Sequence, residues 1–303
     1  MKILVTGGAG YIGTELVKRL SGDPKVTEIY IYDNLARKTY DLFFSKVKNS
    51  NKISFILGDM LDTRKLKGVI DTVDVVYHLA ARVSTPFAHE DPHLYEQINH
   101  WGTAELSYLI EKSDVKRVIY TSSASVYGFS DDVHDESSLP RPTTHYGISK
   151  LNGEKTLSRL DSPDIVILRC GNVYGYGDSL RIDSLVNRFM FESHHYNRIS
   201  IAGSGNQFRA LIHVEKLTHV LANLYDDSLE SGVYNLVDRN MSVNEIVEIL
   251  KVLYPELETI FIEQEIQLRS MLIKRNPIFN ELLQSKSKDL QSELSDFNSR
   301  FTF

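Results

Sequence analysis

The sequence lacks several features that would point to an extracellular, membrane or nucleic-acid-binding protein. It contains a single cysteine, Cys170, so no disulfide can form within the chain. It has no apolar run of the ~18 residues that a spanning helix needs, and the apolar residues 3–5 are too few for a signal peptide. It has no long basic run, and its formal net charge is -6. These absences predict a soluble cytoplasmic protein that binds neither nucleic acid nor a membrane.

Short apolar segments alternate with helical patterns over the first 170 residues. The chain has 303 residues and 42% hydrophobic content, which suffices for a large core. The alternation predicts an α/β fold, in which a doubly wound parallel sheet is covered by helices. The expected strands cover residues 3–5, 28–33, 54–59, 73–79, 117–121 and 164–169.

The regular alternation ends near residue 170. We expect residues 1–170 to form one domain and residues 171–303 a smaller region, interleaved with late strands of the same sheet such as 233–236. From Leu283 the chain is rich in Ser, Lys and Gln, which predicts a loosely packed helix or a frayed tail. An earlier helix is expected around residues 95–112. Its candidate core contacts are Leu94, Ile98, Trp101, Leu106 and Leu109.

Three glycines follow the first expected strand. Gly7, Gly10 and Gly13 have the spacing GxxGxxG and stand between a strand and a helix, as in a dinucleotide-binding turn. One glycine permits the tight turn, the next lets the backbone approach a pyrophosphate, and the last lets the helix pack closely. The free N–H groups of the helix N-terminus then face the phosphates. The pattern predicts a bound dinucleotide.

The second expected strand ends in an acid. Asp33 follows Gly13 by 20 residues, where a carboxylate can bond the hydroxyls of the adenosine ribose. A negative charge there repels a 2′-phosphate, which favours NAD over NADP. Arg37 and Lys38 lie close enough along the chain to keep NADP open. The simpler alternative is that Asp33 only forms a turn before Asn34.

Tyr146 and Lys150 form a YxxxK pair on a predicted helix. Their spacing places both side chains on one face, one turn apart. Lowering the pKa of a phenol from ~10 to ~7 takes roughly 4 kcal/mol, and a nearby ammonium acts in that direction. A serine cluster, residues 122–125, follows a strand and is therefore expected at its carboxyl end. Alone, the pair is equally compatible with two ordinary surface residues.

Together these motifs resemble the extended short-chain dehydrogenase/reductase family of NAD-dependent nucleotide-sugar epimerases and dehydratases. The resemblance covers about residues 1–250 and implies a Rossmann-like fold. It rests on motifs in the expected order: TGGAGYIG, Asp33, Gly58-Asp59, HLAA, SSASVYG, YGISK, RCGNVYG and GSGNQFRALIHV.

The resemblance implies a role for each matching residue. Tyr146 resembles the catalytic base, Lys150 the lysine that lowers its pKa and holds the nicotinamide ribose, and Ser123 the serine that bonds the reacting hydroxyl. The residues expected around NAD are Gly7, Gly10, Tyr11, Ile12, Gly13, Asp33, Asn34, Asp59, Met60, Leu79, Ala80, Ala81, Tyr146 and Lys150. Ile12 is equally expected as a core residue.

A nucleotide-diphosphate sugar is the substrate that the resemblance implies. Ser125 matches a second hydroxyl position near the sugar, and Asn172 an asparagine that contacts the phosphates. Arg209 resembles an arginine that binds the diphosphate, and Arg269 falls where relatives often carry a second one. A homodimer is also expected from the family, through the helix that holds Tyr146 and the helix of residues 95–112. No metal site is expected.

The residues after Ser123 favour one reaction over others. Dehydratases of this family carry a Glu or an Asp-Glu pair there, whereas this chain has Ala124, Ser125 and Val126. We therefore expect a 4-epimerase that works through a 4-keto sugar. A 4-keto-sugar reductase, a dehydratase or decarboxylase, and a non-catalytic NAD-sensing protein stay open as alternatives. Residues 181–184 lack the Asn-Leu-x-Pro pattern of UDP-galactose 4-epimerase, so the sugar is not identified.

Overall fold

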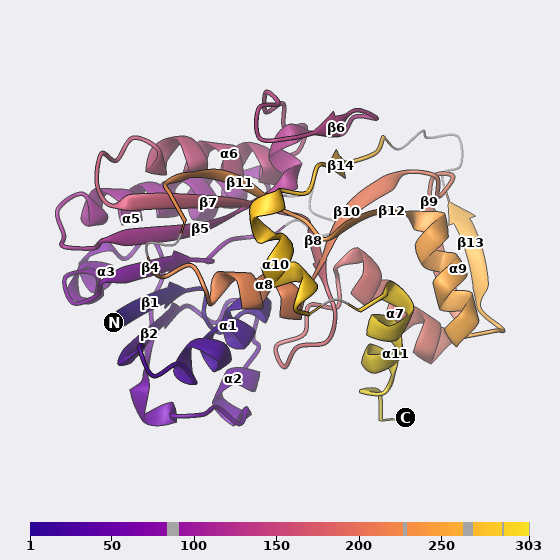
Figure 1. Cartoon of the computed structure of the whole chain (residues 1–303), viewed down its shortest axis with the longest axis horizontal. Helices are drawn as coiled ribbons and strands as arrows, with labels where there is room; N and C mark the ends of the chain where they lie inside the picture. Colours follow the sequence, from indigo (N-terminus) through magenta and orange to yellow (C-terminus); the bar gives the residue numbers. More distant parts are fainter. Residues whose placement is uncertain (84–90, 227–228, 263–268, 287, 303) are drawn as a thin grey trace.

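The main sheet is parallel throughout. The computed structural model describes residues 1–303 except 84–90, 227–228, 263–268, 287 and 303. Within this part of the chain, 7 strands pair in the order β11-β7-β5-β4-β1-β2-β3 (Figure 1). Every pairing is parallel, which confirms the predicted Rossmann-like, doubly wound fold. The strands are β1 Lys2–Thr6, β2 Glu28–Asp33, β3 Ile53–Leu57, β4 Val75–His78, β5 Arg117–Ser123, β7 Asp164–Cys170 and β11 Gly232–Leu236.

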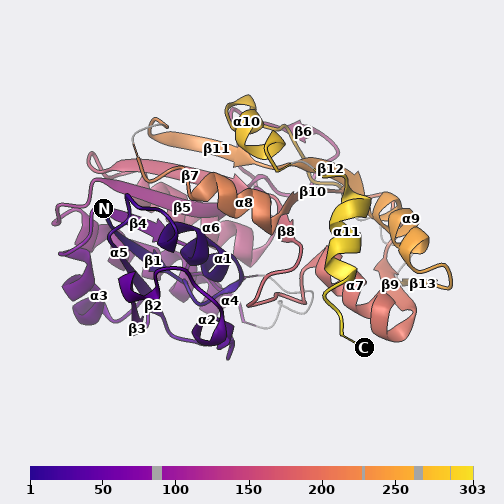
Figure 2. The same cartoon turned by 60° about the horizontal axis from the view of Figure 1, so that its bottom comes forward.

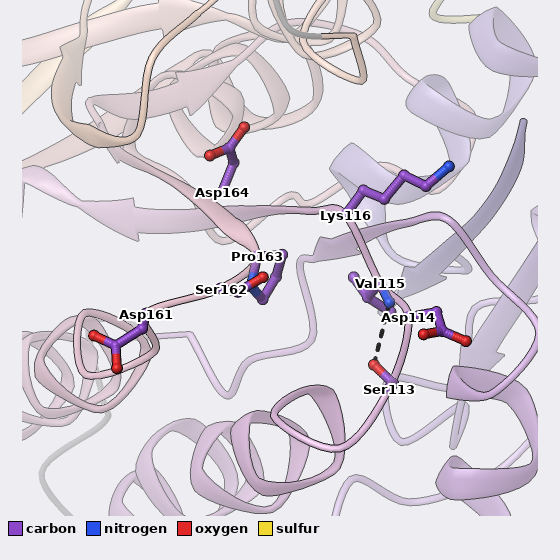
Figure 3. A pocket seen from close by; sticks show the side chains of 8 residues that line it. All are labelled: Ser113, Asp114, Val115, Lys116, Asp161, Ser162, Pro163 and Asp164. Atoms are coloured by element: carbon purple, nitrogen blue, oxygen red, sulfur yellow. Dashed lines mark hydrogen bonds between the residues drawn. The ribbon is translucent and has the colours of Figure 1, made fainter.

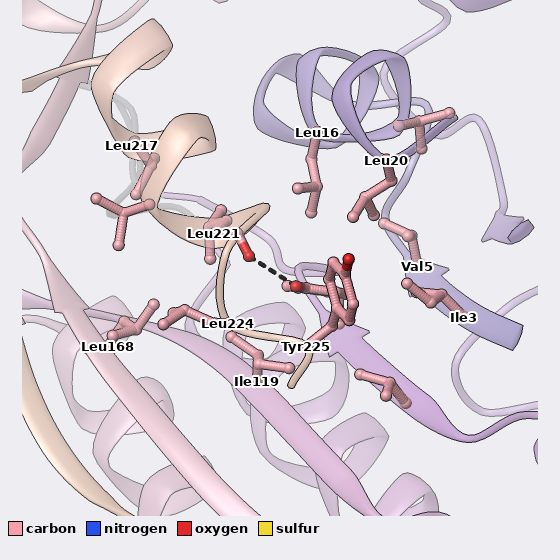
Figure 4. Close-up of a cluster of buried hydrophobic side chains, with 14 of the residues drawn as sticks. Ile3, Val5, Leu16, Leu20, Ile119, Leu168, Leu217, Leu221, Leu224 and Tyr225 are labelled. Atoms are coloured by element: carbon pink, nitrogen blue, oxygen red, sulfur yellow. Dashed lines mark hydrogen bonds between the residues drawn. The ribbon is translucent and has the colours of Figure 1, made fainter. Parts of the chain in front are cut away.

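Helices cover both faces of this sheet. One face carries α1 (Tyr11–Ser21) and α8 (Val214–Leu221), and the other α3 (Thr63–Ile70), α5 (Gly102–Ile110) and α6 (His145–Leu157). Figure 4 shows Leu16 and Leu20 of α1 facing Leu217 and Leu221 of α8 above the strands. All four leucines are fully buried. The apolar side chains of alternating strands and helices thus form one core on each side of the sheet.

The second half of the chain builds a smaller body beside the carboxyl ends of the strands (Figure 2). Its strands are β8 (Asn172–Tyr174), β10 (Phe208–His213) and β12 (Arg239–Ser242) in one sheet, and β9 (Arg198–Ala202) with β13 (Glu258–Ile262) in another. Helices α7 (Leu185–Tyr196), α9 (Val243–Leu253) and α11 (Leu290–Asn298) pack around them.

The remaining elements are short. They are α2 Asp41–Phe44, α4 Pro92–Tyr95, α10 Asn280–Gln284, the strand pair β6 Val133–His134 and β14 Leu272–Ile273, the π-helix Glu96–Trp101, and 3-10 turns at Ser50–Lys52, Ala124–Tyr127 and Pro277–Phe279. Among the described residues, no helix combines the length and apolar character that crossing a membrane requires.

The prediction of a frayed C-terminal tail is wrong for α11. Leu290, Leu294 and Phe297 are at most 3% exposed and belong to the core of the smaller body. Glu293 on the same helix is buried and accepts an ion pair from Lys216 Nζ at 2.9 Å. Since these partners come from distant segments, the polar local composition gave no sign of them.

Trp101 is also placed differently from the prediction. Its side chain is 52% exposed, whereas the buried position nearby belongs to Asn99. The helix is π-helical at Glu96–Trp101, and the wider turn shifts the face that later residues present. Asn99 Nδ2 donates to Ser149 Oγ on α6 at 3.0 Å, and its Oδ1 accepts from the backbone N–H of Arg82 at 2.7 Å. A polar side chain thus joins α6 to the end of β4.

Candidate functional site

The glycine turn has the geometry that a bound pyrophosphate requires. Gly7 has a φ of +71°, and a Cβ there would lie 2.7 Å from the backbone nitrogen of Ala80. A Cβ on Gly13 would lie 2.3 Å from the carbonyl oxygen of Gly7, so only glycine lets α1 pack against the turn. Gly10, by contrast, faces open space apart from the Gly7 oxygen at 3.2 Å. The turn and the N-terminus of α1 therefore form an open cradle of backbone N–H groups.

Asp33 closes the other side of this cradle. Its Oδ2 accepts from Ala9 N at 3.1 Å in the glycine turn, and its Oδ1 accepts from Leu35 N at 2.8 Å. Burial raises the pKa of Asp33, and the two backbone hydrogen bonds oppose that rise. The carboxylate stands at the carboxyl end of β2, the position predicted for contact with a ribose.

Asp33 gives the first testable prediction. Asp33→Ala is expected to weaken NAD binding by about 10- to 100-fold, since hydrogen bonds to a charged group contribute ~1.5–3 kcal/mol. Calorimetric titration with NAD measures it, and Asp33→Asn, which keeps the oxygen that faces Ala9, should lose less. Affinity for a nucleotide sugar should stay the same in both variants. An unchanged NAD affinity would refute the ribose contact.

The other residues predicted around the cofactor gather at the same edge of the sheet. Asn34 Nδ2 donates to Asp59 Oδ2 at 2.8 Å, which joins the ends of β2 and β3. Leu79, Ala80 and Ala81 follow β4, and the Ala80 N–H reaches Thr6 Oγ1 at 3.3 Å. Met60 is buried, and Ile12 is half-buried against the core.

Tyr11 points away from the glycine turn. Its hydroxyl donates to the carbonyl oxygen of Gly175 at 2.5 Å, and its side chain is buried. Thr14 on the same helix bonds Ser179 at 2.9 Å. The side chain of Tyr11 thus holds the segment after β8 against α1, so a contact with the cofactor would come from its backbone.

Ser123 and Tyr146 meet at the carboxyl end of β5, and Lys150 lies one helical turn after Tyr146 on α6. Helix α6 begins where Thr144 Oγ1 accepts from Gly147 N at 3.0 Å, so Tyr146 lies in its first turn and Lys150 one turn later. The Tyr146 hydroxyl forms a hydrogen bond with Ser123. Ser125 Oγ donates to Ser123 Oγ at 2.9 Å.

Burial is the largest influence on the pKa values of Tyr146 and Lys150. It raises the pKa of Tyr146, and the charge of Arg181 and the hydrogen bond with Ser123 act in the opposite direction. Burial also lowers the pKa of Lys150 to about 7. Because Lys150 titrates near neutrality, its predicted action on the phenol depends on which groups keep it protonated.

The residues predicted to bind the diphosphate lie beyond this group, in the smaller body. Arg209 stands on β10, Asn172 on the adjacent β8, and Arg209 Nη1 donates to the carbonyl oxygen of Arg269 at 3.1 Å. Burial lowers the pKa of Arg209 to about 10, and its guanidinium lies over the ring of Phe129. Arg209 and Arg269 are therefore neighbours, although 60 residues separate them in sequence.

Several residues around Tyr146 had no signal in the sequence. The ring of Tyr95 meets that of Tyr146 edge-on at 6.3 Å, and Arg181 Nε donates to Asp183 Oδ1 at 3.1 Å. Cys170 is buried at the end of β7, where burial raises the pKa of its thiol to about 12. Each comes from a different segment, so only the folded chain brings them together.

A buried ion pair anchors α6 to the sheet behind these residues. Arg169 Nη2 on β7 donates to Glu154 Oε2 at 2.7 Å, and Arg169 Nε donates to Glu154 Oε1 at 3.1 Å. Ser122 on β5 donates to the same carboxylate. The pair fixes α6 one turn after Lys150, since Glu154 follows Lys150 at i+4.

A surface pocket lies at the opposite edge of the sheet. Lys116 and Pro163, which line it, precede β5 and β7 (Figure 3). Ser123 and Cys170, by contrast, end those strands. Ligands of open parallel sheets bind at the carboxyl ends of the strands, so this pocket is separate from the candidate site. No group of three or more metal-ligating side chains occurs among the described residues.

Sequence comparisons show the family to which the chain is similar. The family model described as "NAD dependent epimerase/dehydratase family" matches residues 3–236. The chain is 31% identical over 258 residues to a putative UDP-glucose 4-epimerase of Methanocaldococcus jannaschii, covering 82% of this chain and 81% of that protein. It is 28% identical over 270 residues to dTDP-D-glucose 4,6-dehydratase of Mus musculus, covering 85% and 75%.

Solved structures include a close match to the whole chain. The UDP-glucuronic acid 4-epimerase of Bacillus cereus, in complex with UDP-glucuronic acid and NAD, superposes with a TM-score of 0.85. Its sequence is 25% identical, and the match covers 99% of this chain and 98% of that one.

Proposed function

Because the chain belongs to the NAD-dependent epimerase/dehydratase family, we propose that it is a 4-epimerase of a nucleotide-diphosphate sugar. The observation that carries the proposal is the hydrogen bond between Ser123 and Tyr146, with Lys150 one helical turn after Tyr146 and no carboxylate in the residues that directly follow Ser123. The family comparison identifies NAD as the cofactor.

The residues present fit NAD. The cradle of Gly7, Gly10 and Gly13 has no room for side chains at Gly7 and Gly13, and Asp33 stands beside it. Lys150 would hold the nicotinamide ribose from α6. When bound, NAD supplies an acceptor for the hydrogen on the sugar carbon and returns it later.

The chain's own residues move the proton. Tyr146 takes it from the 4-hydroxyl of the sugar, and Ser123 bonds the same oxygen, which orients it toward the phenol. Lys150 in its ammonium form favours the phenolate. In the second half-reaction Tyr146 returns the proton to the C4 oxygen, while C4 regains its hydrogen on the opposite face, so no second redox substrate is consumed.

Arg209, Arg269 and Asn172 would hold the diphosphate while the sugar turns over. The guanidinium of Arg209 is partly buried, and its hydrogen bonds within the described chain go to the carbonyl oxygens of Phe208 and Arg269 rather than to an acid. An anionic diphosphate would satisfy it better than water or another side chain. Ser125, bonded to Ser123, would face a further sugar hydroxyl.

A dehydratase requires groups that positions 124–126 do not supply, whereas a keto-sugar reductase does not. Loss of water across neighbouring carbons needs an acid and a base beside Tyr146. Positions 124–126 supply neither. Among the described residues, the influences on the Tyr146 phenol are burial, Arg181, Ser123, Cys170 and Tyr95. A keto-sugar reductase would use the same three residues, so only the products separate it from an epimerase.

A panel experiment tests the function. The purified protein is incubated with UDP-, TDP-, GDP- and CDP-sugars and a trace of NAD, and NMR identifies the products. We expect one isomer to accumulate well beyond the amount of NAD, without net reduced cofactor. Loss of water, or turnover only with stoichiometric reduced cofactor and a keto sugar, would overturn the proposal in favour of a dehydratase or reductase.

Replacing Ser123 is expected to change the pH dependence of catalysis in a definite direction. Its hydrogen bond lowers the pKa of Tyr146, so Ser123→Ala should raise that pKa. More alkaline solution is then needed to form the phenolate, and the acidic limb of kcat/KM should move to higher pH. At neutral pH the loss should be about 10- to 100-fold, because a hydrogen bond to a charged group contributes ~1.5–3 kcal/mol.

Ser123→Thr serves as the control for this prediction, since it keeps a hydroxyl at the position. Ser123→Thr should keep the acidic limb of kcat/KM at the pH where the wild-type protein has it. A pH profile in Ser123→Ala that falls uniformly without moving would contradict the hydrogen bond to the ionising phenol.

We further propose a homodimer. Trp101 is 52% exposed, Tyr108 is 53% exposed on α5, and Ile148 is 40% exposed on α6. Pairing these helices with those of a second copy would cover the three side chains. We also expect residues 1–170 to act mainly in cofactor binding, residues 171–303 mainly in substrate binding, and the protein to work in the cytoplasm.

A further inference from the structure

Lys150 depends on its protein neighbours to stay protonated. Its side chain is 1% exposed, and burial alone disfavours the ammonium form. No hydrogen bond from its Nζ is present among the described residues. A lysine that must act as a cation at neutral pH needs some compensating contact in such a place.

Cys170 and Glu154 act to raise the pKa of Lys150, but burial outweighs them. Glu154 on α6 is engaged by Arg169 through two guanidinium nitrogens, so its charge is already balanced. Cys170 on β7 keeps its proton, because burial raises the pKa of its thiol to about 12. Tyr146 on α6 likewise has its pKa raised by burial.

His78 on β4 is neutral for the same reason. Burial, together with the charge of Lys150, lowers the pKa of His78 to about 3. Its ring nitrogens lie 2.8 Å from the hydroxyls of Thr6 and Thr103. A neutral imidazole neither attracts nor repels the ammonium group strongly.

Among the described residues around Lys150, Tyr120 on β5 makes the one direct contact that favours its ammonium form. Lys150 Nζ lies 4.0 Å from the centroid of the Tyr120 ring, over its face. The π face carries partial negative charge, and such a contact is strongest where water is excluded. Tyr120 is fully buried, and burial raises the pKa of its hydroxyl well above the ordinary value, so the ring stays neutral.

Contacts with β4 and α6 fix the ring in this place. It stacks on the His78 ring with centroids 5.3 Å apart, and its hydroxyl lies 3.5 Å from the Lys150 carbonyl oxygen. A Cβ at Gly153 would come within 2.5 Å of that hydroxyl, so glycine leaves the space that the ring occupies beneath α6. The packing therefore aims the ring face at the ammonium group.

We propose that Tyr120 is a positioning residue for the reaction: its ring face holds the Lys150 ammonium group in place and keeps it protonated. The inference rests on the proposed function, in which the cation favours the Tyr146 phenolate. The ring of Tyr120, rather than its hydroxyl, is the part that acts on the Lys150 ammonium group.

The test changes the charge of the ring face without changing its shape. Phenylalanine, 4-fluorophenylalanine, 3,5-difluorophenylalanine and 3,4,5-trifluorophenylalanine are placed at position 120, which weakens the π face step by step. The pKa of Lys150 is read by NMR on protein labelled with [¹³Cε]lysine and supplied with excess NAD. The variant Lys150→Arg identifies the Lys150 resonance.

We expect Tyr120→Phe to keep the wild-type pKa of Lys150, because the ring face is retained. Across the fluorinated series that pKa should fall steadily, by about one unit at the trifluoro member. The alkaline limb of kcat/KM should move down by the same amount, since the ammonium form is lost at lower pH. Tyr120→Met, which removes the ring at similar volume, should give at least as large a shift.

A fluorinated series with an unchanged lysine pKa would overturn the proposal and leave Tyr120 as a packing residue. The NMR titration needs no turnover, so it stands apart from the proposed function. If the lysine pKa falls across the series but Tyr146→Phe is fully active, the contact holds and the proposed reaction fails. If Tyr120→Met does not fold, the fluorinated variants alone decide the outcome.

Discussion

Replacing Tyr146 with phenylalanine is expected to lower kcat by at least about 10²- to 10⁴-fold, the range that a general base contributes. The substitution removes one hydroxyl, which bonds Ser123, and leaves the ring in place. Phenylalanine has no group that can take the proton of a sugar hydroxyl. Folding and NAD affinity should therefore be nearly unchanged. Single-turnover kinetics with a sugar nucleotide, together with calorimetric titration of NAD, measure the two parts of this prediction.

Tyr95→Phe is the matched control. Tyr95 lies edge-on to Tyr146 at 6.3 Å and is 4% exposed, so it is a second buried phenol in the same place. It has no predicted part in proton transfer, and its loss should change kcat far less. Equal activity in Tyr146→Phe and the wild-type protein would contradict the assignment of the base. An equal loss in both variants would indicate that the ring environment, not the proton acceptor, was disturbed.

Replacing Glu154 with glutamine is expected to lower the free energy of unfolding by about 3–5 kcal/mol. The side chains of Glu154 and Arg169 are 5% and 7% exposed, and they are joined at 2.7 Å. Glutamine removes the negative charge and leaves the Arg169 guanidinium buried without it. Denaturant unfolding followed by circular dichroism measures the change. Since Glu154 lies one turn after Lys150, kcat should fall as well.

The pair Lys67–Asp71 provides the comparison for Glu154. Its side chains are 58% and 45% exposed, and its atoms lie 2.5 Å apart on the surface of α3. Asp71→Asn should cost less than about 1 kcal/mol, because water and salt screen exposed charges. Similar losses in the two variants would show that the buried pair contributes no more than an ordinary surface contact. A double variant, Glu154→Met with Arg169→Leu, should recover part of the stability, because neither charge is left alone.

Local sequence patterns predicted the parts of the molecule that depend on neighbours in the chain. Glycine at positions 7 and 13 is required by backbone contacts within a few residues or with the adjacent strand end, and the structure shows these contacts. The acid at the end of β2 was predicted from its distance to the glycine turn. The alternation of apolar and helical segments predicted the parallel sheet, because each strand and helix carries its own pattern.

Features built from distant segments could not be predicted in this way. Arg181 and Tyr95 meet Tyr146 only after the smaller body and the π-helical turn are in place. The burial of α11 depends on Lys216, which lies on α8. Trp101 was assigned to the core from helical spacing alone, and the π-helical turn changed which side chains face inward.

The most direct test of the central claim uses a nucleotide sugar that carries deuterium on C4 of the hexose. The protein is incubated with this substrate and unlabelled NAD, and the position of the deuterium in the product is read by NMR. The proposed function predicts an epimer that keeps the deuterium at C4, because the hydrogen leaves and returns to the same carbon. Deuterium at C6 of a product that has lost water, or a product whose C4 hydrogen came from added reduced cofactor, would contradict it.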